Sequence, residues 1–364
     1  MTQKTIDNVQ AVRGIAVIIV VFFHLAVMDR LYGGGKLVHP VFYLGTAGVD
    51  IFFVISGFIM VYTTYAKFDD PGYVRTFAIR RITRIVPLYW LLSALVFCFS
   101  LFYPNMINKS AGFKVDVVAS FFFLPSHILP LVPVGWTLNY EMYFYFVFAL
   151  FILFVPRKWL GYALAVWCIS AFVLGPNPPA AALAESPWWG QTFSPFVFEF
   201  CAGALIGLMF FSGVRGLSIT TSLIALVWFA VALVALQYYR PGEEHDPLIR
   251  VLAYGPPSAL LIYGVTMLEL QREFKLPGFL VRFGDASYSI YLTHTLVMHF
   301  IGKFLWSRLA GSDHLMYNFF FGALGLVASI LVGFACYQLV ELRFIRWGRK
   351  QPVVGRLRAS ESTT

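Results

Sequence analysis

Long apolar runs separated by short polar connections fill the chain from residue 9 to residue 341. A run of about 17 to 25 apolar residues is long enough to cross a bilayer as a helix. Runs of this kind lie at 9–28, 47–65, 86–104, 136–155, 159–175, 194–212, 217–238, 249–268, 285–306 and 316–341. The fifth is short, and Gly255-Pro256-Pro257 interrupts the eighth. The pattern predicts an all-α fold: a polytopic bundle of about ten transmembrane helices. A shorter run, Val115 to Leu124, is expected to be re-entrant or interfacial.

The composition agrees with a membrane protein and leaves little room for a soluble domain. Of 364 residues, 59% are hydrophobic and 12% are charged, whereas a soluble domain carries about 25% charged residues. The four cysteines sit far apart in apolar segments, which excludes a disulfide framework and a thiolate metal site. His294 and His299 are five residues apart and point away from each other on a helix, so we expect no metal. We predict a membrane domain at 1–345 and a basic, polar tail at 346–364.

The charge distribution predicts the orientation of the chain. A net charge of +9 could indicate a nucleic-acid partner. However, roughly two thirds of the lysines and arginines fall on the side of the membrane that holds the N-terminus, as the positive-inside rule requires of cytoplasmic segments. We therefore expect both termini in the cytoplasm, a lipid bilayer as the partner of the basic groups, and no nucleic acid.

The first apolar run carries polar residues on one face. At 100° per residue, Gln10, Arg13, Val17 and His24 fall within one narrow stripe of a helix, and the rest of the circumference is apolar. Charged side chains at such positions must face the bundle interior or a wet cavity. The alternative is that Arg13 and His24 only cap or snorkel near the helix ends.

Two carboxyl groups enter the membrane from the same side as His24. Asp50 opens the second run, where it could orient a site or act as an interfacial N-cap. Glu141 lies one to two turns into the fourth run, among tyrosines, where a carboxylate is costly unless it is paired. We predict that His24 pairs with Glu141, or second with Asp50, as an acid/base pair. A purely structural ion pair at Glu141 remains an alternative.

Three arginines precede the third run on the cytoplasmic side. The spacing of Arg80, Arg81 and Arg84 puts them on one face of a short amphipathic helix. Guanidinium clusters suit phosphates, although on spacing alone ordinary positive-inside anchoring is the favoured explanation.

A last group of polar residues lies at the start of the ninth run. Ser287 and His294 share a helix face there, and His294 is expected to form a hydrogen bond within the core.

These polar segments, in this order along the chain, resemble those of the acyltransferase family 3 proteins, the membrane O-acyltransferases of bacterial surface polysaccharides. The matching pieces are Asn8-x-Gln10-x-x-Arg13-Gly14 with His24, Gly48-Val49-Asp50-x-Phe52-Phe53-Val54-x-Ser56-Gly57-Phe58, Arg81-x-x-Arg84-Ile85-x-Pro87-x-Tyr89-Trp90, Trp136-Thr137-Leu138-x-x-Glu141 and Ser287-Tyr288-Ser289-x-Tyr291-x-x-His294. Each piece is weak alone, and five in order are specific. The chain is similar to the short exopolysaccharide O-acetyltransferases, since it is expected to stop after the predicted tenth helix.

The resemblance implies a multi-pass enzyme of the bacterial inner membrane. It implies that acetyl-CoA in the cytoplasm donates an acetyl group to a sugar hydroxyl on a polysaccharide or a lipid-linked saccharide, with polysaccharide assembly machinery as a further partner. It also implies that His24 is catalytic and that Arg81 and Arg84 are needed for activity. We expect these two arginines, with Arg80 and Arg13 in support, to bind the phosphates of acetyl-CoA, and Glu141 to orient His24.

Two other classes of protein remain to be weighed. A proton-coupled transporter of a polar metabolite would also contain intramembrane His, Glu and Arg with Pro/Gly breaks. The two halves of the chain show no repeat relation, and a transporter needs no arginine triplet. A structural scaffold for polysaccharide assembly would not explain the buried polar groups.

Overall fold

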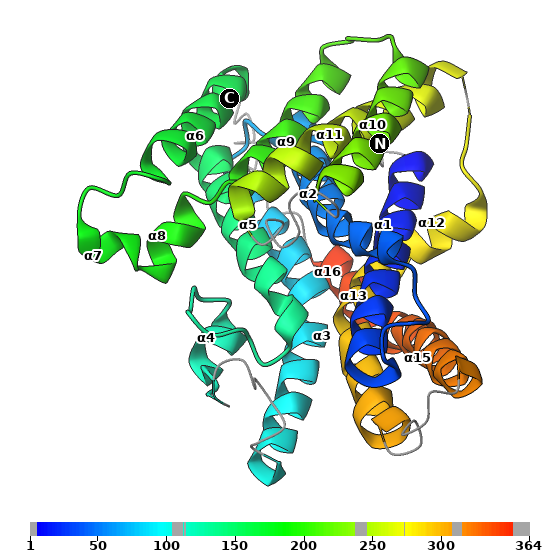
Figure 1. Cartoon of the computed structure of the whole chain (residues 1–364). Coiled ribbons are helices and arrows are strands. Elements are labelled where there is room, and N and C mark those ends of the chain that lie inside the picture. Colours follow the sequence, from blue (N-terminus) through cyan, green and yellow to red (C-terminus); the bar gives the residue numbers. More distant parts are fainter. Residues whose placement is uncertain are drawn as a thin grey trace, which may run out of the picture.

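The computed structural model describes residues 6–103, 112, 114–236, 246–272, 274–307 and 315–351. This part of the chain folds into helices and connections, without a strand (Figure 1). The longer helices are α1 (Asp7–Met28), α2 (Ala47–Thr64), α3 (Tyr73–Phe102), α5 (Trp136–Phe154), α6 (Leu160–Leu174), α9 (Phe196–Phe211), α10 (Ser218–Val234), α11 (Pro247–Arg272), α13 (Ser287–Ile301) and α15 (Leu315–Cys336). Shorter helices are α4 (Val117–Phe122), α7 (Ala181–Ala184), α8 (Pro187–Thr192), α12 (Gly278–Asp285) and α16 (Leu342–Lys350). The predicted all-α class is confirmed.

Eight helical stretches among the described residues are long and apolar enough to cross a membrane. They correspond to the predicted runs 1 to 6, 8 and 10. The seventh run forms α10, which has 17 residues. The ninth forms α13, which continues through a π-helical turn, Gly302–Trp306. The protein is a multi-pass membrane protein, and the total of ten crossings stays a prediction.

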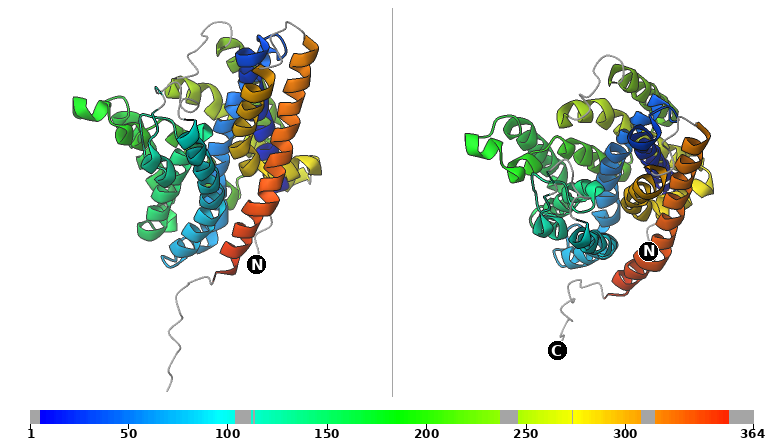
Figure 2. Two further views of the ribbon diagram at one scale, coloured as in Figure 1. Left: turned by 90° about the horizontal axis from the view of Figure 1, so that it is seen from below. Right: turned by 60° about the horizontal axis from the view of Figure 1, so that its bottom comes forward.

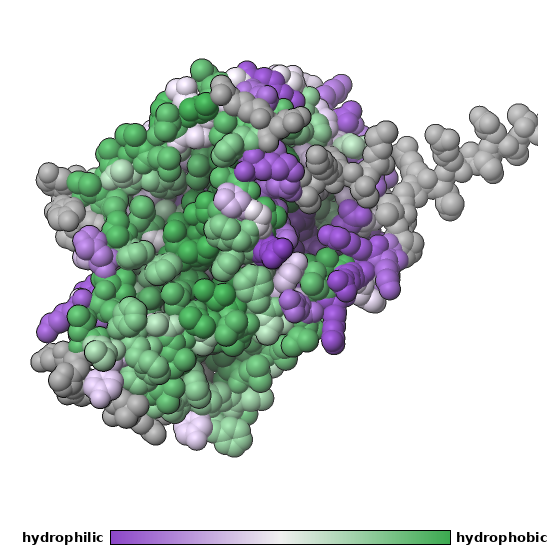
Figure 3. All heavy atoms as spheres, turned by 90° about the vertical axis from the view of Figure 1, so that its right-hand side faces the viewer, coloured by the Kyte–Doolittle hydropathy of each residue, from purple (hydrophilic) through white to green (hydrophobic). Residues whose placement is uncertain are grey.

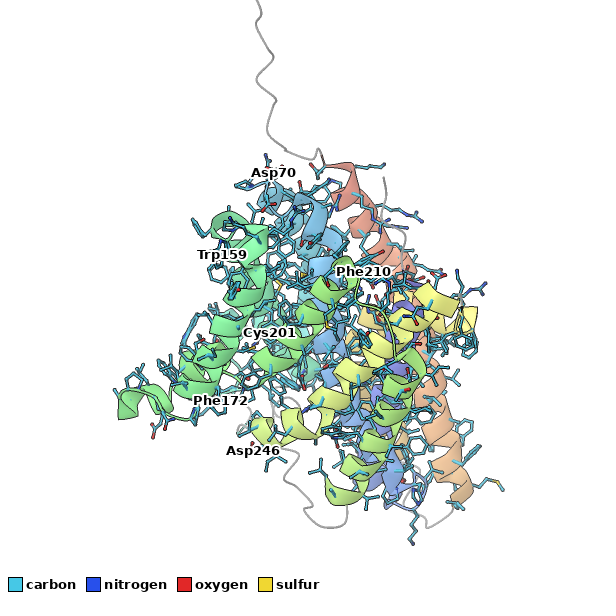
Figure 4. All side chains as sticks on the ribbon, turned by 90° about the horizontal axis from the view of Figure 1, so that it is seen from above. Asp70, Trp159, Phe172, Cys201, Phe210 and Asp246 are labelled. Atoms are coloured by element: carbon cyan, nitrogen blue, oxygen red, sulfur yellow. The ribbon has the colours of Figure 1, made fainter. Side chains whose placement is uncertain are left out.

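The helices run between two ends of the bundle. Figure 4 shows Asp70 and Trp159 toward one end, Cys201 at an intermediate height, and Phe172 and Asp246 toward the opposite end. This alternation is the one expected if consecutive helices cross in opposite directions. Figure 3 shows that the face over α15 is broadly apolar, with hydrophilic side chains gathered toward one edge. The assignment of one end to the cytoplasm rests on the charge distribution.

Two segments that the sequence predicts to be interrupted are continuous helices. α11 runs through Pro256 and Pro257 without a break. α3 starts at Tyr73 and contains Arg80, Arg81 and Arg84 together with Pro87, so the predicted separate amphipathic helix is wrong. A bundle can hold a helical proline because its neighbours and Ser/Thr side chains satisfy freed backbone groups.

The last helix crosses the predicted boundary between domain and tail. α15 passes through a second π-helical turn, Tyr337–Glu341, into α16, which packs against α3 (Figure 2). α16 continues past residue 346 and ends at Lys350, and residues 352–364 of the predicted tail lie outside the described residues.

Glycines allow α2 and α9 to approach each other closely. An added Cβ at Gly57 in α2 would overlap the Phe200 carbonyl of α9, and one at Gly203 in α9 would overlap the Val54 carbonyl of α2. Small residues at a crossing let two membrane helices approach backbone to backbone. This contact fixes the position of α2, whose residues line both cavities described below.

Candidate functional site

The first turn of α1 is held in place by a polar clamp. The Asn8 side chain donates hydrogen bonds to the carbonyls of Val265 (3.1 Å) and Phe274 (2.8 Å), and its oxygen accepts one from the Leu276 amide (2.8 Å). The Glu269 carboxylate accepts from the backbone amide of Asn8, at 2.7 Å, which satisfies an N–H group left open at the helix start. Asn8 therefore anchors α1 to α11 and to the segment that follows it.

Gln10 orients Arg13 on the next turn of α1. Its amide nitrogen donates to Asp285 Oδ1 at 2.7 Å, and its amide oxygen accepts from Arg13 Nη1 at 3.0 Å. Asp285 is the last residue of α12, so the contact also ties α1 to α12. The polar stripe predicted for α1 thus faces the interior, and Arg13 is 8% exposed.

A cavity of about 60 Å³ lies in the middle of the bundle, and Arg13, Arg81 and Arg84 all line it. We call it the arginine cavity. Its walls come from α1, α2, α3, α5 and α13, so residues far apart in the sequence meet there. The other polar side chains that line it are Ser56, Thr137, Glu141, Tyr145, Ser287, Tyr288 and Tyr291. Its volume gives room for a few water molecules.

The arginines of this cavity are held without ion pairs. Arg81 Nη2 donates to Thr63 Oγ1 at 3.2 Å, and its guanidinium lies 5.3 Å from the ring centroid of Tyr145. No carboxylate among the described residues forms an ion pair with Arg13, Arg81 or Arg84. Arg81 Nε and Ser287 Oγ are buried and, within the described part of the chain, have no hydrogen-bond partner. The cavity therefore offers several donors to an anion.

Arg80 does not belong to this group. Its side chain is exposed and donates to Tyr73 Oη at 3.3 Å, and it does not line the arginine cavity. On one continuous helix, Arg80 and Arg81 point in different directions because neighbours are 100° apart. The structure therefore does not bring Arg80 together with Arg81 and Arg84, and its supporting role at the phosphates stays a prediction.

Glu141 faces the arginine cavity rather than His24. Ser56 Oγ donates to Glu141 Oε1 at 3.0 Å, and the Tyr145 hydroxyl donates to the same oxygen. Both donors come from lining residues, one on α2 and one on α5. Glu141 thus brings a carboxylate to the cavity that holds the three arginines, without forming an ion pair with any of them.

A second, larger cavity of about 760 Å³ lies beside it and includes His24. We call it the His24 cleft. It is rich in aromatic side chains, and its charged lining residues are Arg30 and Arg250. The aromatic members are Phe23, Tyr43, Trp136, Tyr140, Phe196, Tyr254 and Tyr291. No Asp or Glu is among the described residues that line it.

Asp50 forms a buried ion pair at the edge of this cleft. Its carboxylate is 0% exposed and accepts from Arg250 Nε at 3.1 Å and from Nη2 at 2.8 Å. Arg250 Nη2 also donates to the Thr46 carbonyl at 2.9 Å, and the guanidinium lies 5.7 Å from the Trp136 ring centroid. Asp50 therefore fixes Arg250 in the cleft, and the predicted pairing of Asp50 with His24 is wrong.

The partner of His24 is another histidine. His24 Nδ1 lies 3.1 Å from His294 Nε2 and 3.0 Å from the Val20 carbonyl oxygen, and His294 Nδ1 lies 3.1 Å from the Ile290 carbonyl oxygen. His294 is 0% exposed. No carboxylate among the described residues hydrogen-bonds to His24, so the predicted His24–Glu141 pair is also wrong.

The sequence points to His294 only indirectly. Its position relative to Ser287 and Tyr291 predicts that all three share one face of α13. In the structure Ser287 and Tyr291 line the arginine cavity, and His294 contacts His24. The spacing within α13 cannot reveal that this face meets α1. That contact depends on how the two helices pack, and the pattern of one helix does not contain it.

The two cavities adjoin at a common wall. Val49 of α2 and Tyr291 of α13 line both of them. Tyr291 is fixed there by a hydrogen bond from its hydroxyl to the Val134 carbonyl (3.2 Å) and by one that it accepts from Thr137 (3.1 Å). The eleven residues from Arg13 to His24 span about 16 Å of helix and return to the same face of α1. A ligand that reaches from one cavity into the other must pass Val49 and Tyr291.

Comparison with known families places this chain in a class of protein. Residues 6–338 match the model of the acyltransferase domain family. The chain belongs to this family, and the protein is a membrane acyltransferase.

Curated relatives refine the class. The chain is 34% identical over 334 residues to the exopolysaccharide production protein ExoZ of Rhizobium meliloti, covering 88% of this chain and 96% of the relative. It is 29% identical to the acyltransferase MdmB of Streptomyces mycarofaciens, covering 85% of this chain and 84% of the relative. It is 28% identical to the peptidoglycan O-acetyltransferase OatA of Listeria monocytogenes, over 49% of this chain and 31% of that longer protein. No solved structure matches the chain significantly.

Proposed function

We propose that the protein transfers an acetyl group from acetyl-CoA to a sugar hydroxyl of an exopolysaccharide or of its lipid-linked precursor. The observation that carries this proposal is the pair of adjoining cavities, one lined by three arginines without ion pairs and the other by His24 and aromatic rings. The relationship to ExoZ and OatA supports exopolysaccharide as the kind of acceptor and acetyl as the acyl group.

The arginine cavity suits the phosphates of the donor. Unpaired guanidinium groups inside a membrane bundle are costly, and an anionic ligand removes that cost. Arg81 and Arg84 would bind phosphate oxygens through their forked N–H groups, with Arg13 held by Gln10 behind them. Because the cavity measures only about 60 Å³, these long side chains must move to admit the donor. The thioester end would then reach past Val49 and Tyr291 toward His24.

The His24 cleft suits a saccharide. Aromatic rings offer flat apolar faces with polar edges, which match the C–H faces and hydroxyl groups of a sugar ring. Arg30 donates to Tyr43 Oη at 3.3 Å and forms no ion pair with a described residue, so it can bind an anionic group of the acceptor. The volume of about 760 Å³ lies in the range of small-molecule sites.

His24 would act as the general base of the transfer. The sugar hydroxyl oxygen attacks the thioester carbonyl carbon, and its proton passes to His24. The carbon–sulfur bond breaks, and the thiolate of coenzyme A takes the proton from His24. Atoms and charge balance without any further reactant.

We place the enzyme in the bacterial inner membrane, with acetyl-CoA reaching the arginine cavity from the cytoplasm. Polysaccharide assembly proteins remain proposed partners.

The proposal is tested by mass analysis of the surface polysaccharide. Cells with the protein are expected to carry acetyl groups that are missing when the gene is deleted. A His24→Ala variant should fail to restore them because the base is gone, while Met316→Ala, at an exposed position of α15 that lines neither cavity, should restore them. A His24→Ala protein that accumulates normally and restores full acetylation would contradict the role of His24. Identical polysaccharide with and without the gene would contradict the proposed function.

A further inference from the structure

His294 is a buried titratable group in contact with His24, and the proposed reaction has not yet given it a role. It comes from α13, 270 residues away along the chain, and its ring meets that of His24 at a centroid distance of 4.7 Å and an interplanar angle of 76°. Its position is fixed from two sides. Ser329 Oγ of α15 donates to the His294 carbonyl at 3.3 Å, and the Ile290 carbonyl holds Nδ1.

The hydrogen bonds determine which nitrogen of His294 carries the proton. A carbonyl oxygen can only accept, so His294 Nδ1, at 3.1 Å from the Ile290 oxygen, must be protonated. The ring is 0% exposed, and no carboxylate among the described residues contacts it, so the neutral form is favoured. In a neutral imidazole the other nitrogen is an acceptor. His294 Nε2 therefore presents a lone pair to His24.

The same reasoning assigns the proton of His24. Its Nδ1 faces two acceptors, the Val20 carbonyl at 3.0 Å and His294 Nε2 at 3.1 Å. Nδ1 must therefore carry the proton, and Nε2 is left with a lone pair. Nε2 has no hydrogen-bond partner within the described part of the chain, and the His24 side chain lines the cleft. The unprotonated nitrogen is the one free to meet an acceptor hydroxyl.

We propose that His294 is a positioning residue that holds the Nδ1 proton of His24 and so keeps the His24 Nε2 lone pair available to the acceptor. It takes the place of the carboxylate that orients the histidine of a serine-protease triad. When His24 takes up the hydroxyl proton, it becomes an imidazolium whose Nδ1–H donates to His294, which stabilises the new charge without a buried carboxylate. This inference rests on the proposed function.

Two substitutions separate this role from a structural one. In His294→Asn, the amide nitrogen can replace Nδ1 and keep the bond to the Ile290 carbonyl, but the side chain is too short to reach His24. In His294→Gln, the longer side chain can place an amide oxygen near the former Nε2 and accept the His24 proton. The matched control is His299→Asn, because His299 lies on the same helix and is exposed. Its ring lies 2.8 Å from the Thr295 carbonyl and has no other hydrogen bond within the described residues.

Acetyl transfer is measured in membranes with equal amounts of each protein, with kcat and KM for the acceptor determined separately. We expect His294→Asn to lower kcat by about tenfold or more with KM unchanged, His294→Gln to recover much of that loss, and His299→Asn to match wild type. An unchanged kcat in His294→Asn, a change in KM alone, or an equal loss in the Asn and Gln variants would overturn the inference. An absence of acetyl transfer in wild-type membranes would instead overturn the proposed function.

Discussion

Several charged residues of the two cavities are held in position by hydrogen bonds or an ion pair to a neighbouring side chain. Gln10 orients Arg13, Asp50 fixes Arg250, and Ser56 and Tyr145 hold Glu141. The Arg250 and Glu141 side chains are therefore held before any substrate binds, whereas the side chains of the arginine cavity must move to admit the donor. In catalysis, groups that are already held need not reorient when charge develops.

Arg84→Lys tests the arginine cavity at the residue scale. Lysine keeps the positive charge but loses the planar fork, so binding of acetyl-CoA should weaken by about 1–3 kcal/mol. Binding is measured on the purified protein in detergent or nanodiscs. Arg80→Lys serves as the control, since Arg80 is on the same helix but outside the cavity, and it should bind as wild type does. If Arg84→Lys and wild type bound acetyl-CoA with equal affinity, the result would contradict phosphate binding by Arg84 and favour positive-inside anchoring.

Much of the site can be predicted from residue positions along single helices, and less from relations between helices. The stripe with Gln10, Arg13 and His24 follows from the period of one helix, and the structure places Arg13 and His24 in cavities as expected. The partner of His24 could not be predicted in this way. Helical rise puts Glu141 and Asp50 at a suitable depth, but it says nothing about which face of α5 or α2 turns toward α1.

At the scale of elements, backbone contacts between helices set the shape of the cavities. α2 lies against α9 through Gly57 and Gly203, and α1 lies against α12 through Gly14 and Gly284. Both α1 and α2 line the arginine cavity and the His24 cleft. The continuity of α3 and α11 through their prolines could not be predicted, because local sequence favours a break there and only the surrounding bundle compensates for it.

Gly57→Ala tests the contact between α2 and α9. The added methyl group would overlap the Phe200 carbonyl, which is backbone and cannot rotate away, so we expect a loss of stability of about 1–3 kcal/mol. Thermal unfolding of the purified protein measures this. Gly161→Ala in α6 is the control, because its added carbon would have only Leu208 Cδ1 nearby, at 3.8 Å. Equal stability of the two variants would show that α2 and α9 can separate without cost.

At the scale of the whole molecule, one helix, α1, lines both cavities. Arg13 lies in the arginine cavity and His24 in the adjoining cleft, about 16 Å apart along α1. With the N-terminus in the cytoplasm, as the charge distribution predicts, the arginine cavity is nearer the donor side and the cleft nearer the outer side. The acyl group would then pass from one cavity to the other, over about half of the roughly 30 Å bilayer core, while donor and acceptor stay on their own sides.

The most direct test of this account uses sealed vesicles of known orientation. Acetyl-CoA with a labelled acetyl group is supplied only on the cytoplasmic face, and the saccharide acceptor is confined to the opposite face. The account predicts labelled acceptor on the far side, free coenzyme A only where the donor was added, and neither product with His24→Ala. Coenzyme A on the acceptor side, or acceptor that crosses the membrane intact, would contradict it and favour a transporter.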